Sequence, residues 1–383
     1  MPDVASDPDL VARITAEIEA EGPMTFARFM ELALYDPDHG YYSTAQARPT
    51  RDGDFLTAPE LHPIFGRAIA RHVAAVWQRL GAPRDFTVRE YGAGSGALGE
   101  AILEGIAHDE PALAATVRYA PAEHNSHRMA ELRKRLAVAG FGDRLAPAEG
   151  PLVGVVLANE FLDALPVHRV RGAADGGLRE LIVTVADGRF TESETAPSTP
   201  LLAARLAADG VRLAPGQVAD VRLADEAWLA EVARDLRGGV ATIVDYALPA
   251  AELYRPARAD GTLVAYLGHV AHDDLFRAVG RQDLTAHVDL TALERAAAAG
   301  GLELLGEASQ AAFLVANGLA DLVEEVRSNR ATSLAQWSEL RASVARLLDP
   351  RALGGFRVVV LGRGVASDPP LPGLAAPHTG AGA

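Results

Sequence analysis

The sequence of 383 residues contains no cysteine. Disulfide bonds and thiolate metal sites are therefore excluded, and the redox compartment stays open. The chain also lacks any run of about 18 apolar residues, so we expect no membrane-spanning helix. Apolar residues nevertheless make up 49% of the chain, which is ample for a hydrophobic core.

Basic residues are scarce relative to acidic ones. The chain has 36 lysines and arginines against 51 aspartates and glutamates, a formal net charge of −15. This balance argues against broad nucleic-acid binding, which depends on neutralising phosphates. It is compatible with a basic protein partner, or with charge used only for solubility. Residues 1–7 are acidic rather than basic, so we predict neither a secretory signal nor a transit peptide, and a cytoplasmic protein.

A glycine-rich turn at residues 92–96 is the most informative segment. It follows a short apolar run at 86–88 and an acid, Glu90. Behind it, apolar residues recur every fourth position from Leu98, which indicates a helix. The order strand, glycine turn, helix lets the backbone approach a nucleotide-like ligand closely, with a helix N-terminus directed at it.

Three interpretations of this turn remain open from the pattern alone. An acid two residues before Gly92 suits a cationic ligand such as S-adenosylmethionine, which we favour. Gly92, Gly94 and Ala97 also satisfy a relaxed dinucleotide fingerprint. The first acid after the next expected strand, Glu123, holds a ribose in both cofactor classes and does not decide between them. The third interpretation is a turn that binds no ligand.

The chain predicts an α/β fold, with strands and helices alternating around a mostly parallel, doubly wound sheet. Residues 1–80 are expected to form a helical N-terminal extension, and 81–364 the main domain, with insertions at about 171–215 and 248–290. The expected strands of the main domain are 86–88, 117–120, 152–158, 240–244 and 356–361. The tail at 365–383 is rich in proline, glycine and alanine, and we expect it to be disordered.

Two acids follow the apolar strand at 152–158. If residues 160–163 form a helical turn, Glu160 and Asp163 lie on one side of it, at the sheet edge where the glycine turn is also expected. Two carboxylates beside a cofactor can hold a guanidinium through paired hydrogen bonds. The alternative is that Glu160 caps a helix and Asp163 is a solvated surface acid.

The histidines give weaker signals. His269, His272 and Asp273 have the spacing of a partial metal site, but no distant third ligand accompanies them, and we predict no metal. His287 is a candidate proton acceptor or substrate-positioning residue, with a structural hydrogen bond as the alternative.

Several separate blocks of this sequence resemble the MidA family of S-adenosylmethionine-dependent methyltransferases. The resemblance covers about residues 23–320. The matching blocks are residues 29–37 with 40–42, 53–60 with 65–66, 90–98, 159–166, 261–263 with His269, and 283–289. Their order along the chain makes the resemblance much more specific than the glycine turn alone.

The resemblance implies a Rossmann-like methyltransferase core with a helical N-terminal extension and insertions on the substrate side. It also implies arginine methylation of a protein, with a respiratory complex I subunit as one candidate partner. A small-molecule amine methyltransferase and a non-catalytic assembly factor are the alternatives. The implied cofactor residues are Glu90, Gly92, Gly94, Gly96, Glu123 and Asn159, with Thr57 and Pro59 in a loop that closes over the pocket. Asn159, Glu160 and Asp163 are implied to lie near the methyl acceptor, and we keep His287 as a candidate catalytic residue from its own sequence context.

This chain departs from the family pattern at several positions. Ala93 and Ser95 replace the usual proline and arginine of the glycine turn, which leaves the backbone cradle intact. Ala247 and Asp260 replace a usual glycine and arginine on the substrate side. The cofactor is therefore better specified by the resemblance than the methyl acceptor.

Overall fold

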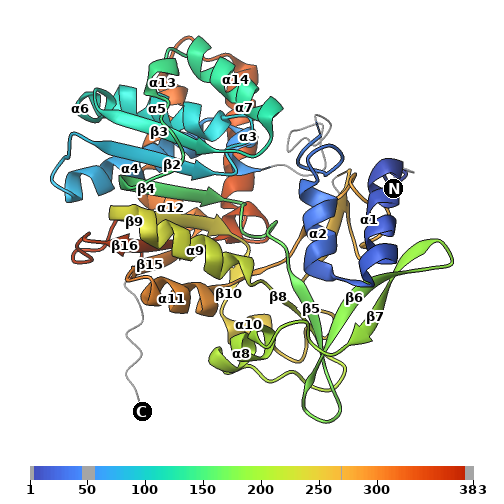
Figure 1. Ribbon diagram of the computed structural model, residues 1–383. Coiled ribbons are helices and arrows are strands. Elements are labelled where there is room, and N and C mark those ends of the chain that lie inside the picture. The colour runs from blue at the N-terminus through green and yellow to red at the C-terminus, as the bar shows by residue number, and fades with distance from the viewer. Residues whose placement is uncertain (1–3, 45–56, 269, 376–383) are drawn as a thin grey trace. The chain divides into compact units, whose positions relative to one another are not determined.

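The computed structural model describes residues 4–44, 57–268 and 270–375 (Figure 1). The chain divides into two compact units, and each unit is assembled from three separate segments. Unit 1 consists of Met1–Leu56, Leu162–Trp228 and Ala247–Arg295, and unit 2 of Thr57–Phe161, Leu229–Tyr246 and Ala296–Ala383. Residues 1–56 of the expected helical extension and both expected insertions thus contribute to unit 1, whereas residues 57–80 of that extension belong to unit 2.

A six-stranded sheet forms the centre of unit 2, in the order β15-β16-β9-β4-β2-β3 (Figure 1). Its strands are β2 (Phe86–Tyr91), β3 (Val117–Ala122), β4 (Leu152–Asn159), β9 (Leu236–Asp245), β15 (Glu303–Ser309) and β16 (Arg357–Arg363). Strand β2 pairs in parallel with β3 and β4, and β4 pairs in parallel with β9. The mostly parallel sheet of the predicted α/β fold is confirmed.

Strand β16 corrects one detail of that prediction. It pairs antiparallel with both β9 and β15, whereas the apolar run at 356–361 was expected to be a further parallel strand. An unbroken apolar run indicates that both faces of a strand are covered, but it carries no information on direction.

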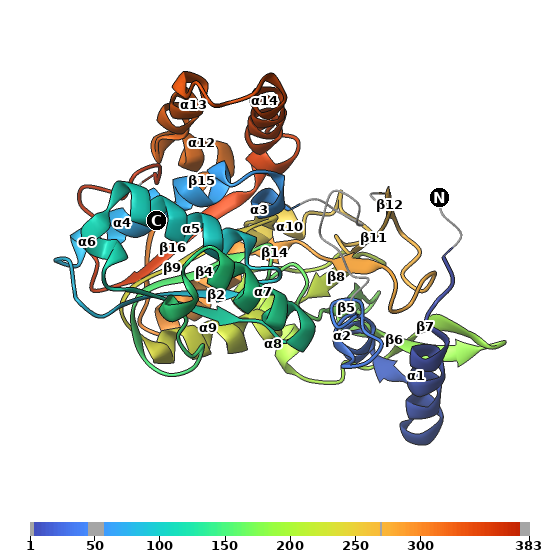
Figure 2. The ribbon, with the colours of Figure 1, turned by 90° about the horizontal axis from the view of Figure 1, so that it is seen from above.

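Helices cover the sheet of unit 2. They are α3 (Ala58–Leu61), α4 (Ile64–Arg79), α5 (Ala97–Asp109), α6 (Pro111–Ala114), α7 (Ser126–Val138), α12 (Gln310–Ala316), α13 (Leu319–Ser328) and α14 (Leu334–Leu348). Helix α4 packs on α5 and on strands β4 and β9, and its apolar residues at every fourth position from Phe65 to Trp77 are buried. Figure 2 shows α12, α13 and α14 grouped together at one end of this unit.

Unit 1 contains smaller sheets. The largest has the order β1-β6-β5-β8, with β7 paired to β6, and all its pairs are antiparallel. The elements of unit 1 are α1 (Pro8–Glu21), β1 (Met24–Thr25), α2 (Phe26–Tyr35), β5 (His168–Gly172), β6 (Leu178–Ala186), β7 (Arg189–Thr195), α8 (Leu201–Ala208), β8 (Val218–Val221), β10 (Ala247–Leu248), α10 (Ala250–Leu253), β11 (Val264–Leu267), β12 (Val270–His272), β13 (Asp283–Thr285) and β14 (Val288–Asp289). Helices α9 (Ala224–Asp235) and α11 (Leu290–Ala299) contain residues of both units.

Local sequence signals explain several of these elements. The hydroxyl of Thr25 accepts a hydrogen bond from the N–H of Arg28 and caps α2, as expected of a threonine before an apolar run. Asp187 and Gly188 both have positive φ, which is the geometry of a tight turn between β6 and β7. These two residues form the turn of the β6–β7 hairpin, and helix α8 follows it in the chain.

We expected the tail at 365–383 to be disordered, and this prediction is wrong for residues 365–375. The structure describes the chain up to Ala375, and the side chains of Val365, Leu371 and Leu374 are buried. The N–H of Ala375 donates to the carbonyl of Glu307 on β15. Three apolar side chains spaced among prolines and glycines were sufficient to anchor this segment, although its composition indicated disorder.

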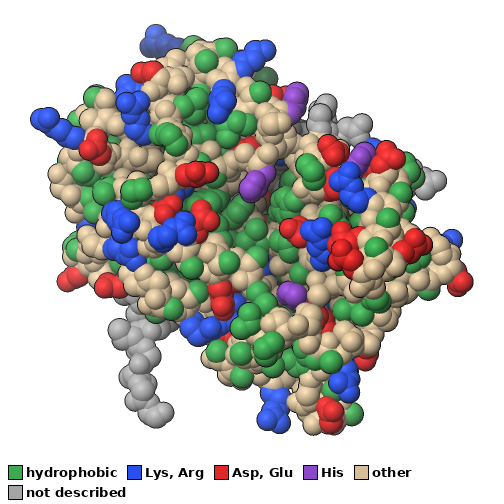
Figure 3. Space-filling model, viewed as in Figure 1, with side chains coloured by type: hydrophobic (Ala, Val, Ile, Leu, Met, Phe, Trp, Pro, Cys, Tyr) green, Lys and Arg blue, Asp and Glu red, His purple; other side chains and the backbone are tan. Residues whose placement is uncertain are grey.

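The charged side chains on the surface and the length and polarity of the helices agree with what the composition indicated. On the face in Figure 3, basic side chains are dispersed among acidic ones. Within the described ranges, no helix is both long and apolar enough to cross a membrane.

Candidate cofactor and methyl-transfer site

The glycine turn joins β2 to α5 in unit 2. Gly92, Gly94 and Gly96 have φ angles of 67°, 53° and 80°, a left-handed region that glycine adopts without strain. Gly96 is the N-cap of α5, and no side chain caps that helix end. The first N–H groups of α5 therefore lie at the turn, where they favour the close approach of a ligand.

The Asn159–Glu160 corner lies beside this turn, as the sequence predicted. Strands β2 and β4 pair in register, with Tyr91 opposite Ala158, so both strands deliver their carboxyl ends to the same sheet edge. A Cβ atom built on Gly92 would lie 3.1 Å from Cδ2 of Phe161. The rings of Phe161 and Tyr91 are 5.6 Å apart between centroids. Within unit 2, the two segments are thus in direct contact.

Residues 160–163 do not form the helical turn that would have placed Glu160 and Asp163 on one side. Glu160 has a φ of 49°, an uncommon value for a residue with a side chain, and no helix is assigned from 160 to 163. Its N–H donates to the carbonyl of Val244, which extends the pairing of β4 with β9 by one residue. Asp163 belongs to unit 1, so the sequence spacing does not fix the relation of its side chain to that of Glu160.

Two donors hold the carboxylate of Glu160. Its Oε1 accepts from the N–H of Ala58 at 3.1 Å and from Nδ2 of Asn159 at 3.0 Å. Ala58 is the first residue of α3, whose N-cap residue, Thr57, makes no side-chain cap. Glu160 therefore does satisfy a helix N-terminus, in agreement with the alternative interpretation, but this helix is a short one from a distant part of the sequence.

Helix α3 also contacts the glycine turn. The hydroxyl of Ser95 donates to Oε1 of Glu60 at 2.6 Å. At the other end of α3, the hydroxyl of Ser343 donates to the carbonyl of Leu61. The polar contacts of this segment thus run through Ala58 and Glu60, whereas the resemblance had indicated Thr57 and Pro59, which are both partly buried. Neither Glu60 nor Ser95 was among the predicted site residues.

Glu90 is buried beneath the turn, with 4% of its surface exposed. It accepts a hydrogen bond of 2.6 Å from the phenol of Tyr119 on β3. Burial raises the pKa of Glu90 to about 8; the hydrogen bond from Tyr119 opposes this shift, and the charge of Glu123 adds to it. A Cβ on Gly99 of α5 would lie 2.3 Å from the Tyr119 ring, so only glycine lets the helix pack over this pair.

Glu123 follows β3 and contacts the glycine turn directly. Its Oε2 accepts from the N–H of Gly94 and its Oε1 from the N–H of Asn125, both at 2.8 Å. The carboxylate is thereby fixed at the carboxyl end of β3, the neighbour of β2. This position suits a ribose-binding acid, as expected from the order of strand, turn and acid.

Asn159 offers a further polar atom. Its Oδ1 is buried, and it has no hydrogen-bond partner among the described residues. The same side chain lines a small void together with Leu98, Leu157 and Thr242. A buried acceptor without a partner at a strand end that faces a glycine turn fits a site that receives a donor from a ligand. The turn glycines, Glu90, Glu123 and Asn159 therefore suit a nucleoside with cationic and hydroxyl groups.

The remaining predicted site residues, Asp163 and His287, lie in unit 1. Their backbone carbonyls both accept hydrogen bonds from Arg222. This buried guanidinium donates to the backbone carbonyls of Asp163, Ala286 and His287. The N–H of Ala286 also donates to the carbonyl of Asp163 at 3.0 Å. Burial, with Arg258 and Arg222 nearby, lowers the pKa of His287 to about 4, so its imidazole is neutral at pH 7.

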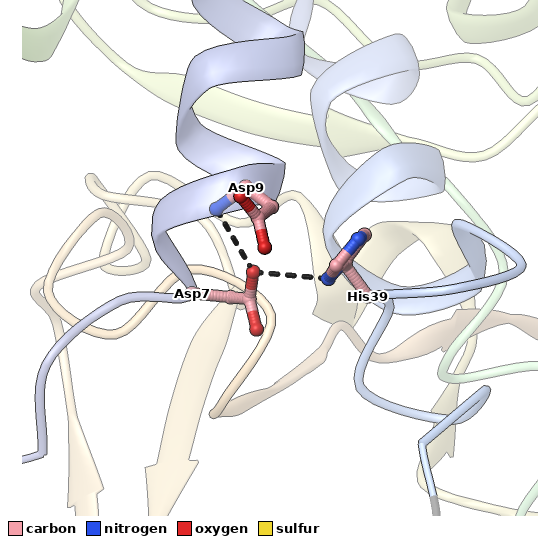
Figure 4. A group of neighbouring side chains, drawn as sticks. All are labelled: Asp7, Asp9 and His39. Carbon is pink, nitrogen blue, oxygen red and sulfur yellow. Dashed lines mark hydrogen bonds and ion pairs between the residues drawn. The ribbon is translucent and has the colours of Figure 1, made fainter.

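One group of three potential metal ligands occurs among the described residues, and it consists of Asp7, Asp9 and His39 (Figure 4). Oδ1 of Asp7 caps α1 by accepting from the N–H groups of Asp9 and Leu10, and its Oδ2 accepts from Arg281. These contacts make Asp7 a helix cap that also pairs with Arg281. His269, from the weak metal pattern, lies outside the described residues.

Comparisons with known proteins agree with this geometry. Residues 68–308 match the family model of S-adenosyl-L-methionine-dependent methyltransferases. A protein from Burkholderia thailandensis, crystallised with S-adenosylhomocysteine, is 33% identical, with a TM-score of 0.84 and coverage of 94% of this chain and 95% of that one. A Drosophila melanogaster relative, named a mitochondrial protein arginine methyltransferase NDUFAF7 homolog, is 27% identical over 80% of this chain and 74% of its own. The Mus musculus protein arginine methyltransferase NDUFAF7, also mitochondrial, is 27% identical over 90% of this chain and 82% of its own.

These names correct one prediction. A cytoplasmic location was expected from the acidic N-terminus, but the curated relatives are mitochondrial proteins, and that expectation is withdrawn. The cofactor prediction is confirmed, because the family model is that of S-adenosyl-L-methionine-dependent methyltransferases and the Burkholderia thailandensis structure contains bound S-adenosylhomocysteine. The family match spans well over half of the chain. The chain therefore belongs to the MidA family of S-adenosylmethionine-dependent methyltransferases.

Proposed function

We propose that this enzyme methylates arginine side chains of a protein. The observation that carries the proposal is the carboxylate of Glu160, held beside the glycine turn by Ala58 and Asn159. The names of the fly and mouse relatives support the same acceptor. A subunit of respiratory complex I stays a candidate substrate.

The chemistry of arginine explains the need for a carboxylate at this place. A guanidinium is protonated at pH 7 and is a poor nucleophile. S-adenosylmethionine supplies an electrophilic methyl group. A fixed carboxylate can hold the guanidinium fork by charge-assisted hydrogen bonds, orient one nitrogen, and stabilise the cationic product. Glu160 is fixed in this way, and its left-handed backbone is the kind of strain that accumulates at functional sites.

We assign the cofactor to the turn glycines, Glu90, Glu123 and Asn159. Thr57 and Pro59 complete the proposed cofactor set. Each of these residues belongs to unit 2. The turn provides the close backbone approach, and the acids provide acceptors for amine and hydroxyl groups.

Asp163 and His287 are proposed as further residues for the acceptor. Burial, together with Asp283, Tyr35 and Asp163, raises the pKa of the Tyr42 phenol in unit 1. The Tyr42 phenol donates to Oδ1 of Asp283 at 2.8 Å. The buried carboxylates of Asp163 and Asp283 in unit 1 would favour a cationic group. The neutral imidazole of His287 is able to accept a proton.

The proposal is tested by transfer of a labelled methyl group. Enzyme incubated with labelled S-adenosylmethionine and a protein extract should place the label in protein, and mass spectrometry of the hydrolysate should find methylarginine. Label confined to the small-molecule fraction would show that the acceptor is a small amine. Protein label on lysine or glutamine instead would refute arginine as the acceptor.

The variant Glu160→Gln separates the two roles of the site. It should bind S-adenosylhomocysteine within about 3-fold of the wild type, while kcat falls by about 10- to 100-fold because a neutral amide holds a guanidinium weakly. Glu303→Gln, on an exposed residue of the same unit, is the matched control and should change neither quantity. Equal losses of S-adenosylhomocysteine affinity and of kcat would indicate that Glu160 binds the cofactor and not the methyl acceptor.

A further inference from the structure

The glycine turn has the spacing of a dinucleotide site, yet the chain uses another cofactor. Gly92, Gly94 and Ala97 match the relaxed fingerprint of a pyrophosphate-binding turn. Such a turn ordinarily offers its N–H groups and helix N-terminus to phosphate oxygens. Something in the structure must therefore disfavour phosphate here.

Two carboxylates already use donors of the turn. Oε2 of Glu123 accepts the N–H of Gly94 at 2.8 Å, and Oε1 of Glu60 accepts the hydroxyl of Ser95 at 2.6 Å. Ser95 immediately precedes the N-cap of α5, so the charge of Glu60 lies next to that helix N-terminus. An acid at this place satisfies the helix dipole and repels a phosphate that would bind there.

Helix α3 holds Glu60 in position. Ala58 is fully buried and its N–H donates to Glu160, while Leu61 is 4% exposed and its carbonyl accepts from Ser343. Glu60 lies between these two anchored residues. The backbone that carries Glu60 is therefore held by a hydrogen bond on each side of it.

We infer that Glu60 is a specificity-determining residue, which excludes phosphate-bearing nucleotides from the glycine turn and admits a nucleoside whose nearby groups are cationic. Specificity of this kind comes from a repulsive element against the wrong ligand. The inference concerns selection of the cofactor and does not depend on which acceptor is methylated.

Binding of ADP and S-adenosylhomocysteine, each measured by calorimetry, tests the inference. Glu60→Gln should shift the ratio of the two affinities toward ADP by about 10-fold or more at low salt. The shift should shrink at high salt, because screening weakens a charge effect but not a packing effect. Glu104→Gln makes the same change on an exposed residue further along α5 and should leave the ratio unchanged.

Ser95→Ala separates charge from the hydrogen bond. It removes the hydroxyl but leaves the carboxylate of Glu60, so it should not favour ADP. An equal gain in Ser95→Ala and Glu60→Gln would overturn the inference, as would an unchanged ratio in a Glu60→Gln protein that still binds S-adenosylhomocysteine. Glu60→Ala is a second charge-removing variant, and thermal unfolding checks that both are folded. Unfolding of both would also contradict the inference, because it would make Glu60 a structural residue.

Discussion

Glu90 shows how one buried carboxyl links stability to pH. Burial raises its pKa from an ordinary 4.5 to about 8. In the unfolded chain the Glu90 carboxyl is ionised at any pH above its ordinary pKa. In the folded protein the same carboxyl stays protonated until the pH approaches its raised pKa of about 8. The folded state therefore binds the extra proton, and its free energy of unfolding falls as the pH rises through this window.

The variant Glu90→Gln tests this linkage, since the amide keeps an acceptor for Tyr119 but does not titrate. Between pH 5 and 8, the free energy of unfolding of the wild type should decline relative to that of the variant by up to about 1.4 kcal/mol per pH unit. Urea unfolding at several pH values measures this difference. Parallel profiles would mean that Glu90 is already ionised in the folded protein.

Gly92 is the residue at which the glycine turn lies against the segment of the Asn159–Glu160 corner. Gly92→Val places a branched side chain at a φ of 67°, where its Cβ would be 3.1 Å from the Phe161 ring. We expect loss of S-adenosylhomocysteine binding by at least about 10-fold, with destabilisation of roughly 1–3 kcal/mol from the backbone strain.

Gly140→Val is the matched control for that change. Gly140 has a φ of 85° in the same unit, and a Cβ there would meet no atom within 4 Å. It should show a similar loss of stability in urea with normal binding in calorimetry. If both variants lost affinity equally, the effect would come from destabilisation and not from the turn.

At the scale of elements, the start of α1 depends on one side chain. Asp7 is buried, caps two N–H groups and contacts Arg281 and His39. Asp7→Ala should lower the free energy of unfolding by about 1–2 kcal/mol, the usual cost of a lost cap. Asp9→Ala, on the exposed first turn, should cost clearly less. A similar small loss in both would show that the cap does not support the fold.

Elements also show where sequence reasoning succeeded. The strand that precedes the glycine turn, the helix behind it and the strand before Glu160 were all predicted from apolar spacing, because periodicity reports local burial. The direction of β16 was not predictable, since burial on both faces looks the same in either direction. The left-handed corner at Glu160 was not predictable, because carboxylates at i and i+3 are equally compatible with a helical turn and with an irregular corner.

At the scale of the whole molecule, contacts between distant segments limited prediction. Glu60 meets Ser95, Tyr119 meets Glu90, and Arg222 meets Asp163 over separations of 35, 29 and 59 residues. No local sequence pattern predicts such contacts between distant residues. The same limit applies to the two units, each of which is assembled from three segments of the chain.

The central claim is that the glycine turn and the Asn159–Glu160 corner form one methyl-transfer site. A crystal structure of this protein with S-adenosylhomocysteine tests it most directly. We expect the ligand to lie against Gly92–Gly96, with Glu123 at its ribose and with Asn159 and Glu160 beside its sulfur. A ligand bound away from the turn, or one whose sulfur lies far from Glu160, would contradict it.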